Sequence, residues 1–311
     1  MGGVFVLFYE MLALLVIASI GFIARKYAIL PKESNQVITN VILYITLPAL
    51  ILYSMDIVLT SDILAEFILL FGLSIYALGT ATIVGYVMRK KSSIDSEQKG
   101  VYEALIIFGN QGFIGYAVTY HLFGEIGILY TAIFMLLYLF LIWTYAIYLV
   151  ARSYQRINMK LLLVNPGVLA TTLGLVFMML PVSWPPSVST LLLTLGEMTM
   201  PLSMLLIGSL LAGISLSAYK SILFSKYIWL AVLAKLIIIP MLLLPFLYLP
   251  ISLTVIGVAI LVTATPSAPT ISMFAEKYGG DAKFAALVVA MSTMFCVVTI
   301  PLFYGMILWL I

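Results

Sequence analysis

Residues 102–120 read YEALIIFGNQGFIGYAVTY, an apolar stretch that is interrupted by the glycine-rich segment Gly109-Asn110-Gln111-Gly112-Phe113-Ile114-Gly115. The stretch has about the 20 residues that a helix needs to cross a membrane. A helix broken at that depth leaves backbone amide and carbonyl groups without partners, and lipid cannot supply them. The interruption therefore predicts a broken helix whose open groups face protein or a water-filled cavity.

The rest of the chain is as apolar as this stretch. Of its 311 residues, 64% are hydrophobic and 9% are charged, and the mean hydropathy is +1.21. A water-soluble domain needs more charged surface, so the composition excludes that class. Apolar stretches of membrane-spanning length occur at residues 4–24, 35–55, 64–88, 102–120, 126–150, 161–181, 187–211, 226–249, 251–274 and 283–309. They are too long for barrel strands, so we expect an all-α integral membrane protein with ten transmembrane helices.

The basic residues indicate how the chain is oriented. Fourteen of the 15 Lys and Arg residues lie in the first, third, fifth, seventh and ninth gaps between the apolar stretches. Positive residues in short loops stay on the cytoplasmic side of a membrane. We therefore expect a multi-pass protein of the plasma (inner) membrane with both termini outside the cytoplasm. The net charge of +3 follows from this loop bias and does not indicate a nucleic-acid partner.

A short motif recurs along the chain. Residues 45–49, Ile-Thr-Leu-Pro-Ala, return as Met-Thr-Met-Pro-Leu at 198–202, 153 positions later. The same offset places the interrupted segment 109–115 on residues 262–268, where Pro266 and Ser267 interrupt the ninth apolar stretch. We therefore expect two five-helix repeats, residues 1–153 and 154–311. An odd number of spans inserts the second repeat upside down, which is the construction of many secondary transporters.

These motifs resemble those of the auxin efflux carrier family, which includes the plant PIN proteins and bacterial malonate-type carriers. The matching segments are Leu30-Pro31, Thr46-Leu47-Pro48-Ala49-Leu50, Asn110-Gln111-Gly112-Phe113-Ile114-Gly115, Asn165-Pro166-Gly167 and Pro266-Ser267-Ala268-Pro269. Their order and spacing agree over the whole chain, although Ala117 stands where many members have proline. The resemblance implies that the broken fourth and ninth helices cross near mid-membrane with the substrate beside the crossing. It also implies that Asn110 and Asn165 contact the substrate carboxylate.

The interrupted segments and the resemblance together define a candidate substrate site. Its expected residues are Asn110, Gln111, Gly112, Gly115, Asn165, Pro266, Ser267 and Pro269. Asn165-Pro166 is also a favourable helix start, because Asn caps helices and Pro suits their first turn. A helix from Pro166 to Leu180 would be about 22 Å long, too short to span a membrane. Its N-terminus would then lie at membrane depth, where its partial positive charge favours a carboxylate.

Glu197 and Lys235 are the deepest ionisable residues, each about ten residues inside an apolar stretch. A charge at that depth costs roughly 2.5–3.5 kcal/mol and is therefore a functional candidate. Either the two residues form a structural ion pair, or they act in transport. In the second case Glu197 would carry a coupling proton and Lys235 would attract an anion.

The function that the sequence favours is secondary transport of a small organic anion, a carboxylate or an auxin-like substrate, by alternating access. The alternative is a cation/proton antiporter of related fold, although all four Asp residues lie in or next to the gaps. An enzyme would need a nucleophile with a base, or a metal site, at membrane depth. One His and one Cys do not supply these, so we expect no catalytic or metal-binding residue. We expect membrane lipid as a partner and no tightly bound cofactor. The sequence leaves the coupling ion (proton or sodium) and a homodimer open.

Overall fold

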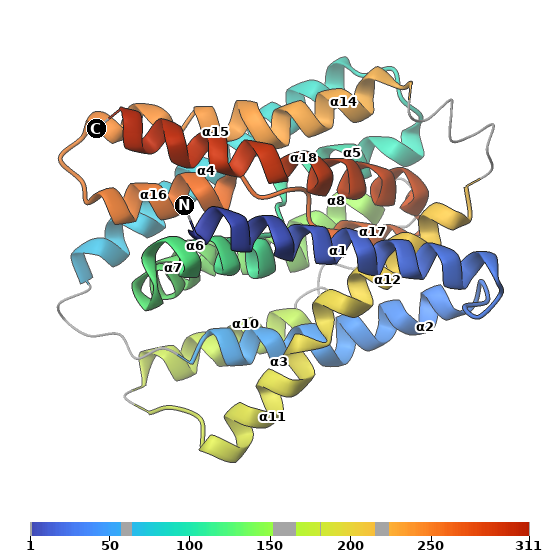
Figure 1. Ribbon diagram of the computed structural model, residues 1–311, viewed down its shortest axis with the longest axis horizontal. Helices are drawn as coiled ribbons and strands as arrows, with labels where there is room; N and C mark the ends of the chain where they lie inside the picture. The colour runs from blue at the N-terminus through green and yellow to red at the C-terminus, as the bar shows by residue number, and fades with distance from the viewer. Residues whose placement is uncertain (1, 57–63, 152–165, 181, 215–223, 311) are drawn as a thin grey trace.

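The computed structural model describes residues 2–56, 64–151, 166–180, 182–214 and 224–310. In these residues every regular element is a helix, as expected (Figure 1). The elements up to residue 151 are α1 (Gly2–Lys26), α2 (Ser34–Val41), η1 (Ile42–Thr46), α3 (Leu47–Ser54), α4 (Leu64–Lys91), α5 (Ser96–Ile107), η3 (Gln111–Gly115), α6 (Tyr116–Phe123), α7 (Glu125–Leu141), η4 (Ile142–Ala146) and α8 (Ile147–Ala151). The boundary that we expect between the two repeats, at residue 153, lies outside the described residues.

The elements from residue 166 onward follow the same helical pattern. They are α10 (Pro166–Met179), α11 (Pro186–Glu197), α12 (Thr199–Ala212), α14 (Lys226–Leu233), η5 (Ala234–Ile238), α15 (Ile239–Met241), η6 (Leu244–Tyr248), α16 (Leu253–Thr263), α17 (Pro269–Tyr278) and α18 (Ala282–Trp309). Proline begins three of these helices, α10, α11 and α17, where its missing N–H would have had no partner in any case. The predicted helix start at Pro166 is therefore confirmed.

Among the described residues, six helical stretches are long and apolar enough to cross a membrane. They are Ser34–Ser54, Ala65–Lys91, Ile126–Ala151, Pro186–Ala212, Lys226–Tyr248 and Ala282–Trp309. Many large apolar side chains on the helices are exposed, as expected where lipid takes the place of water. These features agree with an all-α membrane protein. The full set of ten crossings stays a prediction.

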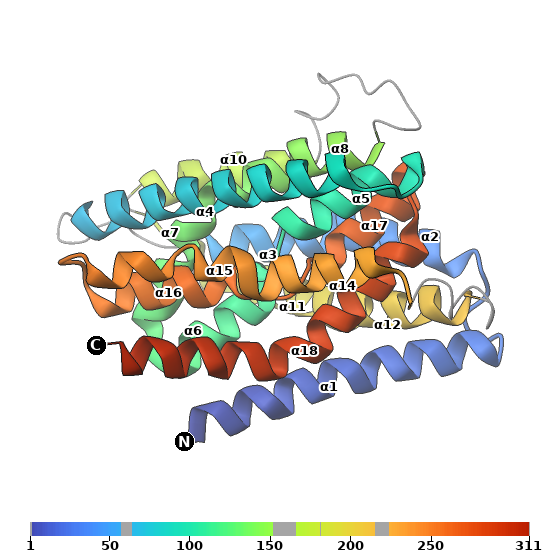
Figure 2. The same ribbon diagram turned by 90° about the horizontal axis from the view of Figure 1, so that it is seen from above.

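The helices form two groups that meet along one face. In the first group α1 packs on α12, and α3 packs on α10 and α11. In the second group α4 packs on α5, α7 and α16, and α17 packs on α18. Figure 1 shows α3, α10 and α11 together along the lower edge, and Figure 2 shows α1 along one side of the molecule. We call these groups the α1–α3/α10–α12 group and the crossing group, since the second holds both broken helices.

Glycine allows the close packing of α1 on α12. A Cβ on Gly208 of α12 would lie 1.8 Å from the carbonyl oxygen of Ala18, and one on Gly21 of α1 would lie 2.2 Å from that of Leu205. Any larger residue at either position would collide with the backbone of the facing helix. Small residues at such contacts are typical of membrane helices, because they let the backbones approach each other.

Glu103 is a buried carboxylate within α5. Helix α5 begins at Ser96, so Glu103 lies beyond its first turn. Its side chain is 1% exposed, and its Oε2 lies 2.6 Å from Nε of Arg89, at the end of α4. A buried carboxylate needs such a partner because its desolvation is costly.

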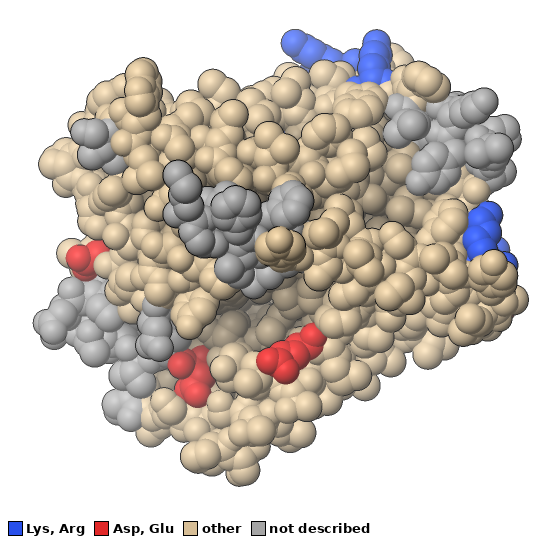
Figure 3. All heavy atoms as spheres, viewed as in Figure 1, with Lys and Arg blue, Asp and Glu red and all other residues tan. Residues whose placement is uncertain are grey.

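On the face shown in Figure 3, the Lys and Arg side chains gather toward one end and the acidic side chains toward the other.

A candidate substrate site at the crossing of two broken helices

Both interruptions that the sequence predicts are present. Helix α5 ends at Ile107, and Phe108 is extended (φ −95°, ψ 121°) before the π-helical turn η3 begins at Gln111. Helix α16 ends at Thr263, and Ala268 is again extended before α17 begins at Pro269. Each extended segment exposes backbone groups that no helix satisfies. The question is then where the hydrogen bonds of these segments go.

The two extended segments satisfy each other. The backbone N–H of Asn110 donates to the carbonyl of Pro266 at 2.6 Å, and the N–H of Ala268 donates to the carbonyl of Phe108 at 3.0 Å. These bonds form an isolated antiparallel bridge at Gly109 and Ser267. The extended segments of the two broken helices therefore lie directly against each other, and their depth in the membrane stays a prediction.

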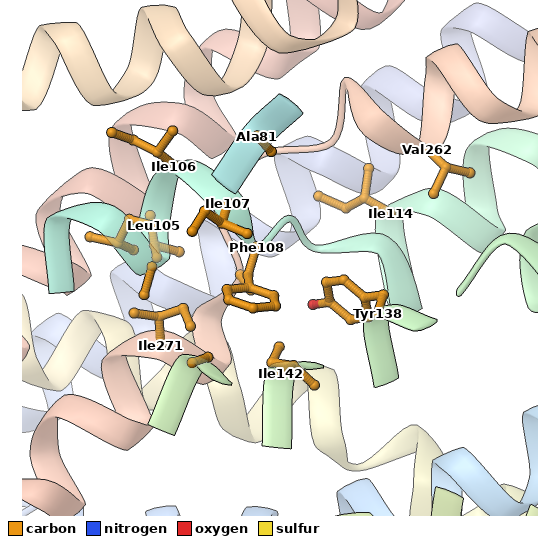
Figure 4. Packing of buried hydrophobic residues seen from close by; sticks show 14 of the residues in the cluster. Ala81, Leu105, Ile106, Ile107, Phe108, Ile114, Tyr138, Ile142, Val262 and Ile271 are labelled. Carbon is orange, nitrogen blue, oxygen red and sulfur yellow. The ribbon is translucent and has the colours of Figure 1, made fainter. Parts of the chain in front are cut away.

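Side chains satisfy further groups around the crossing. Tyr138 Oη donates to the carbonyl of Gly109 at 2.6 Å, and Ser267 Oγ donates to that of Leu105 at 2.8 Å. The N–H of Ser267 donates to Ser292 Oγ at 3.1 Å. Figure 4 shows the ring of Tyr138 facing that of Phe108, with the ring centroids 5.7 Å apart. These contacts hold the extended segments in a fixed position between α7 and α18.

The bridge pairs Phe108 with Ala268, Gly109 with Ser267 and Asn110 with Pro266. The predicted correspondence of residues 109–115 with 262–268, at an offset of 153, stays a prediction.

A cavity lies beside the crossing, between the two groups of helices. Its accessible volume is about 50 Å³. Leu47, Leu50 and Ile51 of α3 form an apolar wall, and Met135, Leu139 and Trp143 stand opposite in the crossing group. The polar residues that line it are Ser54, Asn110, Tyr116, Tyr138, Thr199, Ser203 and Thr270. None of the described lining residues is charged.

Two of these polar groups have no hydrogen-bond partner in the part of the chain that the structure describes. Asn110 is 4% exposed and its Nδ2 has no hydrogen bond; Thr199 is 1% exposed and the same holds for its Oγ1. Leaving a buried donor unsatisfied costs about 1–3 kcal/mol. Asn110 comes from the crossing group and Thr199 from α12, so the two unsatisfied groups belong to different helix groups. A ligand that accepts hydrogen bonds would satisfy both.

Helix N-termini add positive potential on the same side. Helix α17 begins at Pro269, and its first residues, with Ala268 and Thr270, line the cavity. Gly112 and Phe113, in the first turn after the other break, line it as well. The N-terminal amides of a helix carry partial positive charge and favour anions. The arrangement can therefore bind an anion with neutral donors and helix ends, with no charged side chain at the wall.

The predicted site residues divide into four sets. Asn110, Gly112 and Pro269 line the cavity. Pro266 and Ser267 form the crossing, and Gly115 packs beneath it, where a Cβ would lie 3.6 Å from Val262. Gln111 is 3% exposed with Oε1 unpaired, although it is not among the lining residues. Asn165 lies outside the described residues.

The start of α10 nevertheless lies close to the cavity. A Cβ on Gly167 would lie 1.7 Å from the indole ring of Trp143, so the glycine packs directly on that ring. Trp143 is itself a lining residue. The Asn165-Pro166-Gly167 motif thus adjoins the site through its glycine.

Glu197 and Lys235 do not form the ion pair that was one of the two expectations. Glu197 ends α11 with an exposed side chain. Lys235 is 1% exposed in η5, and its Nζ donates to the carbonyl of Thr263 at 3.3 Å. The lysine is therefore at the crossing, whereas the glutamate is not.

Sequence reasoning missed several lining residues. Thr199 could have been found from the sequence, because it is the second copy of the Thr-x-Pro threonine. In the structure, Oγ1 of Thr46, the first copy, is also buried without a partner among the described residues. Tyr138 and Trp143 carry no such signal. They lie in a uniformly apolar stretch, where aromatic residues are common as packing material.

Two comparisons relate the chain to known proteins. Residues 6–161 and 150–304 match the model of a family described as membrane transport protein. Over 118 residues the chain is 26% identical to an uncharacterized transporter of Methanocaldococcus jannaschii. This alignment covers 38% of the chain and 38% of the length of that curated relative.

Proposed function

The chain belongs to the membrane transport protein family, that of the auxin efflux carriers, and from this premise we propose that it is a secondary transporter of a small organic anion. The observation that carries the proposal is the pair of unsatisfied polar groups, Asn110 Nδ2 and Thr199 Oγ1, on different helix groups that line the cavity. A carboxylate accepts hydrogen bonds from both and lies at the N-terminus of α17. Asn165 would supply a further amide from the start of α10.

The proposed architecture is ten spans in two inverted repeats, residues 1–153 and 154–311. Paired hydrogen bonds at the crossing support it, since each extended segment both donates to and accepts from the other. Two glycines with positive φ, Gly124 (67°) and Gly279 (92°), support it as well. Each ends the second half of a broken helix and precedes a long helix, α7 or α18. The family model matches the chain in two overlapping segments, residues 6–161 and 150–304.

Alternating access would arise from movement of one group of helices against the other. The cavity is bounded by α3 and α12 on one side and by the crossing and α7 on the other. A bound carboxylate that bridges Asn110 and Thr199 would link the two groups. Rocking would then expose the site to one side of the membrane at a time, while the extended segments keep their mutual hydrogen bonds.

The coupling ion stays open in this proposal. Glu197 lies near the middle of Pro186–Ala212 with an exposed carboxylate. A charge at that depth is costly in lipid, so we propose that water reaches it between the helix groups and that it carries a proton. A uniporter driven by the membrane potential is the other route, because one charge moving across 100 mV releases about 2.3 kcal/mol.

The proposed location is the inner membrane, with both termini outside the cytoplasm. The single cysteine, Cys296, is buried, so introduced cysteines can be labelled without background. Ser93 and Ser183 are exposed and lie in gaps of opposite predicted side. An impermeant maleimide applied to whole cells should label Ser183→Cys and leave Ser93→Cys unlabelled. The reverse pattern would overturn the orientation.

The substrate can be found by combining a binding screen with a transport assay. Purified protein is heated in the presence of acetate, malonate, benzoate or indole-3-acetate, because a ligand that binds only the folded state raises the melting temperature. A carboxylate that stabilises the protein should also show saturable uptake in proteoliposomes, and Asn110→Ala should remove both effects. Stabilisation by no carboxylate, together with transport of a metal cation against protons, would favour an ion exchanger instead.

A further inference from the structure

Lys235 is a buried ammonium at the crossing that the proposed substrate site does not use. Its side chain lies in the π-helical turn η5 and is 1% exposed. Nζ donates to the carbonyl of Thr263, the last residue of α16, at 3.3 Å. A Cβ on Gly109 would lie 2.7 Å from the same Nζ. The ammonium therefore contacts both broken helices, although Lys235 is not among the residues that line the cavity.

The two broken helices end with different hydrogen-bond donors. Around the end of α5 the carbonyls accept from neutral groups: Ala104 from the N–H of Phe108, Leu105 from Ser267 Oγ and Gly109 from Tyr138 Oη. At the end of α16, Thr265 Oγ1 donates to Val262, and Lys235 donates to Thr263. The last carbonyls of a helix carry partial negative charge. The end of α16 thus has the Nζ of a buried lysine where the end of α5 has hydroxyls and amides.

No carboxylate neutralises this lysine in the described part of the chain. The ion pair found there joins Arg89 to Glu103, and the deepest other carboxylate, Glu197, is exposed at the end of α11. Burying a charge costs several kcal/mol unless good partners compensate for it. The partner here is the backbone carbonyl of Thr263, and the hydroxyl of Thr265 lies close to the same point beside Gly109. Oxygen ligands of this kind are those that a metal cation would use.

In transporters with broken helices, unwound carbonyls and half-helix C-terminal ends coordinate the coupling cation. We propose that Lys235 is a tethered cation, whose ammonium takes the place of that dissociable ion at the end of α16. The crossing then keeps its shape without sodium, and Lys235 acts as a positioning residue for Gly109 and for Asn110, which follows it. This inference rests on the proposed function for the role of the crossing, but its test requires no substrate.

The experiment is thermal unfolding of the full-length protein in detergent, in sodium chloride or in N-methylglucamine chloride at the same ionic strength. The wild type should melt within about 1 °C in both salts, because no dissociable cation binds the folded state. Lys235→Asn leaves an oxygen ligand and space for an ion. In N-methylglucamine chloride this variant should melt at least about 3 °C below the wild type, and sodium chloride should restore half of that loss or more.

Three further variants separate this role from a simple packing role. Lys235→Met removes the charge and fills the space, so its melting temperature should fall and sodium should not restore it. Lys235→Arg keeps the charge and should stay within about 2 °C of the wild type, because burying a cation beside the same carbonyls preserves the contact. Lys226→Asn changes an exposed lysine at the start of α14 and should have no effect in either salt.

The proposal is overturned by any of three results. The first is a wild type that sodium stabilises, since a separate cation site would then exist. The second is Lys235→Met as stable as the wild type, which would make the ammonium dispensable. The third is a loss in Lys235→Asn that sodium leaves unchanged. If Lys235→Asn does not fold in either salt, the wild-type and Lys235→Met measurements decide. A protein that transported no anion at all would still give the expected pattern, so the two proposals can fail separately.

Discussion

Replacement of Asn110 by alanine should weaken substrate binding without weakening the fold. Asn110 is 4% exposed, and its Nδ2 has no partner in the ligand-free protein, so that amide has no hydrogen bond to lose. A hydrogen bond between this amide and a carboxylate would contribute about 1.5–3 kcal/mol. Since each 1.4 kcal/mol is a factor of ten, the affinity of Asn110→Ala should fall about 10- to 150-fold.

Asn35 is the matched control for this prediction. It is 5% exposed, but its Oδ1 accepts a hydrogen bond from Ser209 Oγ at 2.6 Å. Asn35→Ala should therefore lower the melting temperature and leave affinity unchanged, the opposite of Asn110→Ala. Both quantities come from one thermal-shift titration with the most stabilising carboxylate. The reasoning fails if Asn110→Ala binds within about twofold of the wild type, or if it loses as much stability as Asn35→Ala does.

Three further predictions concern packing, the buried ion pair and coupling. Gly208→Ala should lower the free energy of unfolding by about 1–3 kcal/mol through overpacking, and the folded yield and melting temperature should fall with it. Gly72→Ala, with nothing within 4 Å of its new Cβ, should change neither. Equal behaviour of the two variants would contradict the close contact of α1 with α12. Arg89→Ala should destabilise the protein by about 3–5 kcal/mol, because it leaves Glu103 buried without its cation, and a chemical-denaturation midpoint equal to that of the wild type would refute this. Glu197→Gln should abolish accumulation driven by a pH gradient in proteoliposomes, and continued accumulation would exclude Glu197 as the proton carrier.

The sequence predicted the broken helices because glycine and proline act locally. Gly109 and Pro269 lie within otherwise apolar stretches, and the structure places an extended segment at each interruption. The start of α10 at Pro166 was predictable for the same reason. Such signals depend on a residue and its immediate neighbours, so they survive whatever packing the rest of the chain adopts.

Contacts between distant segments could not be predicted in the same way. Thr199 and Asn110 line one cavity only because two helix groups pack together there, and no local sequence pattern predicts that packing. Lys235 was recognised as deep, and an ion pair with Glu197 was one of the two alternatives for it. In the structure its partner is the backbone carbonyl of Thr263. Because every residue has a backbone carbonyl, the sequence does not indicate which one the lysine contacts.

Lys235 is buried beside the end of α16 and is not among the residues that line the cavity, which affects how a bound substrate would be released. An anion bound directly to a lysine would have to break a strong ion pair in every cycle. Here the buried ammonium is held by the end of α16, and the described wall of the cavity offers only neutral donors and helix ends. Such donors are worth less than a desolvated ion pair, and they are fixed to helix groups that can move apart. Under the proposed function, the positive charge of Lys235 stays with the protein when the anion leaves, so that net charge crosses the membrane with the substrate unless a proton moves with it.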